Sequence, residues 1–285
     1  MEMNAAMVDY HIHLENGPYK LDWLYQFWHT AKKRGLTEIG ITEHCHKFKE
    51  FYPMFSYLAA EDGSYQYMHE WIKKDFQHSL EDYIDLLLRA REQGIQIKIG
   101  LEVDYLPNSS EFIHNIINQY PFDYILGSVH VIGKWGFDYA PRVWEGRDIN
   151  QAYKDYYQVL AAAVNSELFD IIAHFDLIKV FGHRNTVSVE SEVKNILQKM
   201  ADKKLCLEIS SAGIRKPINE LYPAEWIIEY AAKLQVPITF ASDAHYPEDV
   251  GFEWEKLVSC VKKYGYGKYT RFSQRQAFYD KIICV

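Results

Sequence analysis

Histidine and acidic residues recur in short motifs that each follow an apolar run of the sequence. Three motifs are pairs with i, i+2 spacing, and side chains at that spacing on a strand point to the same face. The paired motifs therefore direct two polar groups to one place. The residues are His11 with His13, Glu102 with Asp104 and Asp243 with His245, together with the single residues His44, His130 and His174.

These residue types point to metal binding. Imidazoles and carboxylates are costly to bury unless they are paired or bind a metal, so packing alone does not account for so many after apolar runs. Imidazole and carboxylate ligands without thiolate suit Zn, Mn, Fe or Co, and the candidates exceed what one tetrahedral ion takes. Two or three divalent ions are expected.

Clustered divalent ions favour one chemistry. When a carboxylate bridges them, they generate a hydroxide nucleophile at neutral pH and neutralise the oxygens of an in-line displacement. Phosphoester hydrolysis is therefore the predicted reaction, and amide or lactone hydrolysis is the nearest competitor.

The elements that position these motifs alternate along the chain. Short apolar or β-branched runs predict strands, and amphipathic segments after them predict helices. The segment 66–93 is long enough to form two helices that break near His78 and Ser79. The predicted strands are 7–14, 38–42, 95–105, 124–131, 170–175, 205–210 and 237–242. The predicted helices are 22–34, 66–93, 111–119, 151–166, 190–202, 224–234 and 252–264.

This alternation predicts the fold class. Strands separated by helices pair in parallel through right-handed crossovers, and about seven such units suit a closed barrel. We predict a distorted TIM-like barrel of seven or eight such units within a single α/β domain over 1–285. An open doubly wound sheet is the alternative, but the GxGxxG and GxxxxGK[ST] phosphate fingerprints are both absent. In such barrels, catalytic groups lie at the carboxyl ends of the strands.

Composition excludes several classes of protein. With 48% hydrophobic and 25% charged residues the chain is not disordered. A formal charge of −8 argues against long nucleic acid as a partner. No run approaches the roughly 20 apolar residues of a membrane span, and the N-terminus lacks a signal-peptide pattern, so a cytoplasmic location is expected. The four cysteines form no CxxC pair, and reduced thiols are expected.

The order of the motifs resembles that of the PHP (polymerase and histidinol phosphatase) superfamily, across nearly the whole chain. The matching segments are 11–13, 42–44, 100–104, 128–130, 174–179 and 242–245. Within the superfamily, the segment HFDLIKVFG at 174–182, Glu208-Ile209-Ser210, Arg215-Lys216-Pro217 and Tyr222-Pro223 look most like the histidinol-phosphate phosphatase branch. The resemblance implies a distorted (β/α)7 barrel with two or three metal ions.

The resemblance also implies a role for each ligand. His11, His13, Glu102 and Asp243 would hold one ion, and Glu102 would bridge it to a second ion held with His130 and His174. His44 and His245 would hold a third. Many relatives carry a further histidine at the offset where this chain has Tyr19, and Glu15, Asn16 or His46 is the candidate substitute. Asp104 would orient a ligand.

Catalysis and phosphate binding need further groups. The predicted catalytic residues are Glu102, Asp243 and His245, with Asp243, His245 or a water on the metal as the proton donor. Arg215 and Lys216, after the sixth strand, are expected to bind the substrate phosphate, since arginine offers a bidentate fork. His183 and Arg184 are further candidates.

The small phosphorylated substrate implied by the resemblance is L-histidinol phosphate, an intermediate of histidine biosynthesis. One alternative is a phosphodiesterase or exonuclease acting on nucleotides or short oligonucleotides, with loop aromatics stacking on bases. Another is a metal-binding regulatory module without turnover. The long segments 46–67 and 133–150 are expected to cover the strand ends as lids.

Overall fold

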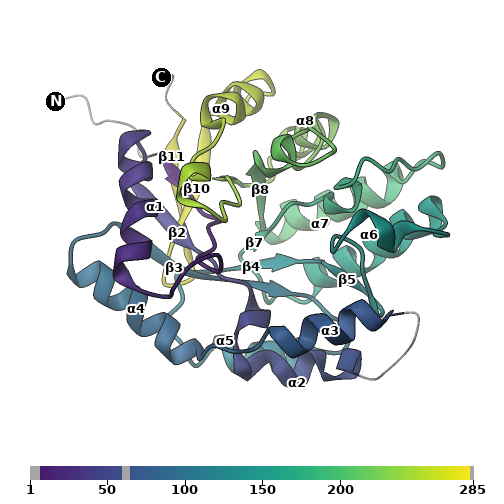
Figure 1. Ribbon diagram of the computed structural model, residues 1–285. Coiled ribbons are helices and arrows are strands. Elements are labelled where there is room, and N and C mark those ends of the chain that lie inside the picture. Colours follow the sequence, from purple (N-terminus) through teal and green to yellow (C-terminus); the bar gives the residue numbers. More distant parts are fainter. Residues whose placement is uncertain (1–6, 60–64, 283–285) are drawn as a thin grey trace.

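The computed structural model describes residues 7–59 and 65–282. Seven parallel strands curve into a nearly closed barrel that is surrounded by helices (Figure 1). The strand order is β1-β2-β3-β4-β7-β8-β9. These strands are β1 Val8–Asp9, β2 Glu38–Ile41, β3 Ile97–Asp104, β4 Tyr124–Ser128, β7 Ile171–Ile172, β8 Cys206–Ser210 and β9 Ile238–Ala241. The helices are α1 Leu21–Lys33, α2 Tyr52–Phe55, α3 Gln66–Lys74, α4 Leu80–Glu92, α5 Ser110–Ile117, α6 Ile149–Asn165, α7 Glu190–Lys203, α8 Glu225–Lys233 and α9 Trp254–Lys263. The predicted TIM-like barrel is confirmed.

Local sequence sets where the helices begin and end. The Ser79 hydroxyl caps α4 by accepting a hydrogen bond from the Asp82 backbone N–H (3.4 Å). This cap follows the break predicted near residue 78, so the segment 66–93 forms α3 and α4. Gly35 (φ +81°) and Gly94 (φ +85°) follow α1 and α4 in the left-handed conformation that glycine adopts without strain.

Backbone hydrogen bonds join the two ends of the sheet. The N–H of Tyr10, just after β1, donates to the Phe240 carbonyl of β9 (3.1 Å). Beyond the strands, the N–H of His13 donates to the Ala244 carbonyl (2.8 Å), and the N–H of Ala244 donates to the His11 carbonyl (3.1 Å). The first and last histidine motifs therefore lie side by side although more than two hundred residues separate them.

Two strands are shorter than the sequence predicts. The predicted strand 7–14 is a regular strand only at Val8–Asp9, because the following residues exchange hydrogen bonds with the chain after β9. The predicted strand 170–175 is regular only at Ile171–Ile172, since the backbone turns at His174 (φ +23°). In both places the chain leaves the ladder where it carries one of the histidine motifs singled out in the sequence.

Two antiparallel hairpins were not foreseen from the sequence. One pairs β5 (Val131–Ile132) with β6 (Trp135–Gly136) after the carboxyl end of β4. The other pairs β10 (Lys268–Ser273) with β11 (Gln276–Lys281). Its Arg271 forms an ion pair with Glu38, the first residue of β2, so this hairpin covers the amino ends of the strands.

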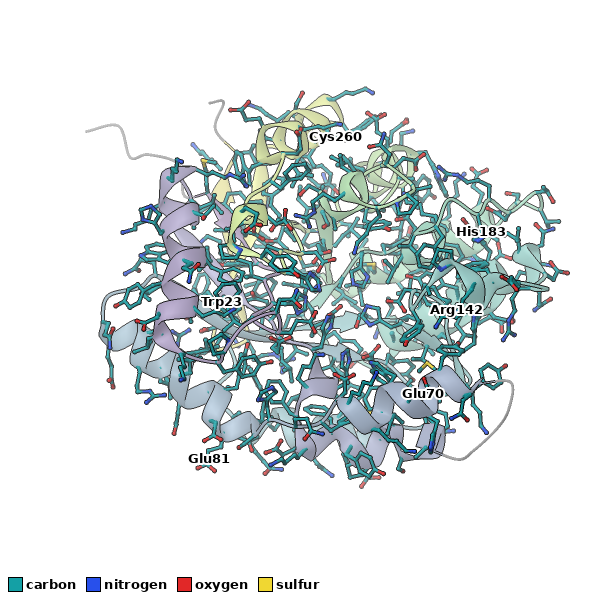
Figure 2. The ribbon with its side chains drawn as sticks, viewed as in Figure 1. Trp23, Glu70, Glu81, Arg142, His183 and Cys260 are labelled. Carbon is teal, nitrogen blue, oxygen red and sulfur yellow. The ribbon has the colours of Figure 1, made fainter. Side chains whose placement is uncertain are left out.

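Side chains fill the interior between the strands and the helices (Figure 2). Aromatic rings occupy the amino end of the barrel, where Tyr10 and Tyr124 stack with ring centroids 4.9 Å apart. The polar motifs lie at the opposite, carboxyl end. Among the described residues, no helix is long and apolar enough to cross a membrane.

Candidate metal centre

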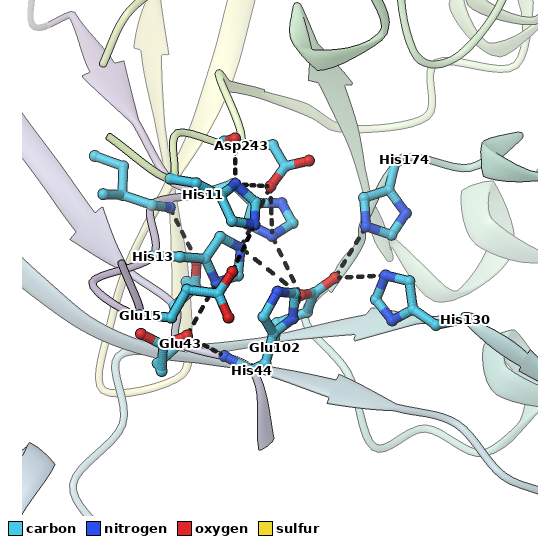
Figure 3. Close-up of polar contacts among 12 residues, drawn as sticks. His11, His13, Glu15, Glu43, His44, Glu102, His130, His174 and Asp243 are labelled. Carbon is cyan, nitrogen blue, oxygen red and sulfur yellow. Dashed lines mark hydrogen bonds and ion pairs between the residues drawn. The ribbon is translucent and has the colours of Figure 1, made fainter. Parts of the chain in front are cut away.

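Glu102, on β3, lies at the middle of the polar cluster (Figure 3). Its Oε1 atom is 2.9 Å from His174 Nε2 and 3.6 Å from His130 Nε2. β3 pairs with β4 from Gly100 opposite Tyr124 to Asp104 opposite Ser128, so the two strands end at the same level and His130 follows directly past the end of β4. Glu102, His130 and His174 thus form one group of possible ligand atoms within 4.8 Å of one another.

The other oxygen of Glu102 faces the motif that follows β1. Glu102 Oε2 lies 3.5 Å from His11 Nε2 and 3.8 Å from His13 Nε2. Asp243 Oδ1 completes this side, at 3.3 Å from His13 Nε2 and 3.9 Å from His11 Nε2. The Glu102 carboxylate therefore presents one oxygen to each of two neighbouring groups of imidazoles.

A third group lies beside the first two. Ligand atoms of His13, His44 and His245 lie within 4.8 Å of one another. His44 Nδ1 is also 2.6 Å from Glu102 Oε2. Glu15 Oε1 lies 3.3 Å from His245 Nε2, so this carboxylate borders the third group.

The polar atoms of these groups are poorly satisfied by the protein itself. Among the described residues, His11 Nε2, His13 Nε2 and Glu102 Oε2 are buried atoms that make no hydrogen bond. Buried polar atoms of this kind normally have a partner, and a divalent cation supplies one for each of them. The residues present therefore fit metal ions.

Three imidazoles are each oriented by a carboxylate at the other ring nitrogen. The pairs are His11 Nδ1 with Glu208 Oε2 (2.6 Å), His13 Nδ1 with Glu43 Oε1 (3.4 Å) and His130 Nδ1 with Asp104 Oδ1 (2.7 Å). Such contacts fix the ring orientation and the tautomer, leaving Nε2 to bind a metal. The predicted orienting role of Asp104 matches this geometry. The role of Glu208 was missed, although an acid inside the buried run 206–210 was a signal.

Comparison with known proteins identifies the family. A model described as PHP domain matches residues 9–212, and a second, described as PHP-associated, matches residues 226–256. The chain belongs to the PHP domain family.

Several relatives of this PHP domain are named as histidinol-phosphatases. A probable histidinol-phosphatase of Deinococcus radiodurans is 34% identical over 217 residues, which cover 73% of this chain and 82% of the relative. The histidinol-phosphatase of Bacillus subtilis is 26% identical over 277 residues, covering 88% of this chain and 97% of the relative. A crystal structure of histidinol phosphate phosphatase from Lactococcus lactis, complexed with zinc, L-histidinol and phosphate, has a TM-score of 0.72 and 24% identity, covering 95% and 98% of the two chains. This last likeness shows the shared fold.

Electrostatics at the centre of the PHP domain favour an ionised Glu102. Burial alone raises the pKa of the Glu102 carboxyl, but the imidazoles of His44 and His130 outweigh burial and hold that pKa well below its usual range. Burial and the neighbouring His13 lower the pKa of His44 to about 3. A carboxylate and a neutral imidazole are the forms that bind metals.

The charge of His11 and His13 depends on the carboxylates around them. Burial lowers the pKa of His11, yet Glu208 and Glu102 outweigh burial and raise it well above the usual value. His13 follows the same pattern, because Asp243 and Glu43 raise its pKa to about 9. A metal ion and a proton therefore compete for these two rings.

Asp243 occupies a strained backbone position that Arg215 supports. Asp243 has φ +53°, in the left-handed region that few residues other than glycine adopt. Arg215 Nη2 donates to the carbonyls of Ser242 (2.6 Å) and Asp243 (3.0 Å), and Nη1 lies 3.1 Å from Asp249 Oδ1. Arg215 therefore anchors the loop that carries a ligand, and its binding of phosphate stays a prediction.

The other predicted phosphate ligands lie in different surroundings. Lys216 is exposed, and the side chain of Arg184, 51% exposed, pairs with Glu220. His183 stacks on Trp144 with centroids 4.4 Å apart and lies well to the side of the barrel axis (Figure 2). The phosphate-binding roles of these residues stay predictions.

Tyr19 takes a different place from a metal ligand. Its ring stacks on His78, with centroids 4.2 Å apart. Of the predicted substitutes, Glu15 faces His245, Asn16 Nδ2 donates to the His245 carbonyl (3.3 Å), and His46 stacks on His44. Of the three, Glu15 thus places a carboxylate oxygen beside the His245 ring.

A pocket of about 150 Å³ opens beside the candidate metal centre. Of the predicted covering segments, 133–150 contributes Gly136, Asp138 and Tyr139 to its lining, and 46–67 contributes His46 alone. Met68 and Trp71 of α3 line one side, and residues of the β5–β6 hairpin and the loop after it line the other. The complete lining is His44, His46, Met68, Trp71, Asp104, His130, Val131, Gly136, Asp138 and Tyr139. Motion of these segments as lids stays a prediction.

Proposed function

We propose that this PHP domain is a metal-dependent phosphatase that hydrolyses L-histidinol phosphate to L-histidinol and phosphate, a step of histidine biosynthesis. The observation that carries the proposal is Glu102, whose two carboxylate oxygens face two adjacent groups of metal-binding side chains. The histidinol-phosphatases among its relatives support the choice of substrate.

The proposed ligand sets follow the three groups. His11, His13, Glu102 and Asp243 would hold one ion, and Glu102, His130 and His174 a second. His44 and His245, with Glu15 beside them, would hold a third. Zn, Mn and Fe all accept such ligands. When bound, adjacent divalent ions supply a deprotonated water as nucleophile and neutralise phosphate oxygens.

The protein's own groups complete the reaction. Hydrolysis breaks the bond between phosphorus and the ester oxygen, and that oxygen takes up a proton as the alcohol leaves. Asp243 and His245, which lie beside one another at the carboxyl end of β9, are the proposed proton donors. Arg215 adds positive charge near Asp243 and is proposed to stabilise the negative charge that develops on the phosphate.

A comparative assay of phosphate release tests the proposal. Protein reconstituted with Mn would be given L-histidinol phosphate, p-nitrophenyl phosphate, nucleoside monophosphates and a short oligonucleotide under the same conditions. We expect the highest kcat/KM with L-histidinol phosphate. Turnover of the other esters without histidinol phosphate would overturn the substrate and point to the nucleotide phosphoesterase alternative. Turnover of none would support a regulatory module.

A further inference from the structure

The pocket beside the metal centre combines aromatic walls with acidic groups. Trp71 of α3 and Tyr139 of the loop after β6 both line it, and Asp104 and Asp138 contribute carboxylates. A cavity of about 150 Å³ holds a single aromatic ring. Aromatic faces and carboxylates both attract organic cations.

The two carboxylates of this pocket differ in their contacts with the rest of the protein. Both oxygens of Asp104 already face imidazoles of the protein: Oδ1 lies 2.7 Å from His130 Nδ1, and Oδ2 lies 3.6 Å from His46 Nδ1. Asp138 makes no hydrogen bond to a side chain among the described residues, and the nearest basic group is His130 Nε2, 4.0 Å from Asp138 Oδ2.

Asp138 also lies outside the metal-ligand groups. None of the three groups of ligand atoms found in the described ranges includes it. Its side chain is 31% exposed, so a bound molecule can reach the carboxylate from the pocket.

We propose that Asp138 binds a protonated nitrogen of the substrate, while Trp71 and Tyr139 hold the organic group that carries this nitrogen. The pocket then selects phosphomonoesters whose organic group carries a positive charge over phosphomonoesters whose organic group is uncharged. This inference rests on the proposed function, since it assumes that the phosphate lies at the neighbouring metal centre. L-Histidinol phosphate, with an amine and an imidazole, belongs to this class.

The test is the selectivity of Asp138→Asn, which removes the charge and preserves the shape. The cationic esters are L-histidinol phosphate and O-phosphoethanolamine, and the neutral ester is p-nitrophenyl phosphate. We expect the ratio of kcat/KM, cationic over neutral, to fall at least about tenfold, because a charge-assisted hydrogen bond is lost. The matched control is Asp85→Asn on the exposed face of α4, which makes the same change in net charge and should leave the ratio unchanged.

Each other outcome separates this inference from the proposed function. An unchanged ratio in Asp138→Asn, with histidinol phosphate still hydrolysed by the unmodified protein, overturns the inference and leaves the function standing. If Asp138→Asn lowers kcat/KM equally for all esters and also lowers the metal content, Asp138 is part of the metal centre. That result also overturns the inference. The unmodified protein could instead fail to hydrolyse L-histidinol phosphate and prefer O-phosphoethanolamine over p-nitrophenyl phosphate. If Asp138→Asn then abolishes that preference, the inference stands and the proposed substrate is wrong.

Discussion

At the scale of single residues, the metal centre depends on pairs in which a carboxylate orients an imidazole. Glu208 orients the His11 imidazole through Oε2, 2.6 Å from His11 Nδ1, and also holds the backbone at His174, whose N–H donates to its Oε1 (2.9 Å). One side chain therefore positions a residue of each of the two groups that share Glu102. Losing it should disturb both.

We therefore expect Glu208→Gln to weaken metal binding by about 10- to 100-fold, as is typical when an orienting partner is lost. Competition with a fluorescent chelator would measure the affinity. Glu255→Gln, an exposed substitution on α9, is the matched control and should bind metal like the unmodified protein. Equal affinities for Glu208→Gln and the unmodified protein would show that Glu208 does not position His11.

The side chains that the structure brings together were easier to predict from the sequence than the carboxylates that orient them. His11, His130 and Asp243 follow apolar runs at regular places, so residue type and position were enough to select them. The function of Glu208 depends on a contact with a residue 197 positions away, on the other side of the β1–β9 junction. Spacing along the chain carries no sign of such a contact.

At the scale of elements, the loop that follows the short strand β7 is fixed by a buried ion pair. After β7, the 3-10 helix Leu177–Lys179 places Lys179 Nζ 2.7 Å from Asp176 Oδ2 and 2.8 Å from the Leu221 carbonyl. Both side chains are nearly inaccessible, at 3% and 4% exposure. This pair holds the loop that follows His174.

Lys179→Met should lower the free energy of unfolding by about 3–5 kcal/mol, because it leaves the Asp176 carboxylate buried without its cation. Urea denaturation of the metal-free protein would measure the change. Lys194→Met is the control, since it breaks an exposed ion pair with Glu190 on α7 and should change stability far less. Similar losses in the two variants would contradict the structural role of Lys179.

Element boundaries were predictable where the rules are local. The cap at Ser79 and the terminal glycines Gly35 and Gly94 lie where residue preferences place them. The early end of β1 was not predictable, because residues 10–13 bond to β9 and to the chain after it, which are distant in sequence. The β10–β11 hairpin was missed as well, since its partners, such as Glu38, are distant in sequence.

At the scale of the whole molecule, the proposed metal site lies where the two ends of the barrel sheet meet. His11 and His13 follow β1, and Asp243 follows β9, so an ion bound by all three ties the first strand to the last. Binding to the folded state alone stabilises a protein by mass action. Metal ions should therefore stabilise the entire barrel.

Addition of Mn or Zn to the metal-free protein should raise Tm, with about 2.7 kcal/mol of stabilisation at a free concentration one hundred times Kd. Differential scanning calorimetry would follow the shift, and excess chelator should reverse it. A variant that lacks a ligand, His13→Ala, should show a smaller shift. A Tm that is the same with metal and with chelator would contradict a site that spans β1 and β9.

The most direct test of the account is metal content and phosphate release in Glu102→Gln. If Glu102 is shared by two ions, the unmodified protein holds at least two per chain, and the variant loses both the shared ions and phosphate release from L-histidinol phosphate. Inductively coupled plasma mass spectrometry on the purified, reconstituted proteins would count the ions. A variant that keeps the full metal content and full activity would contradict the shared carboxylate on which the proposed function rests.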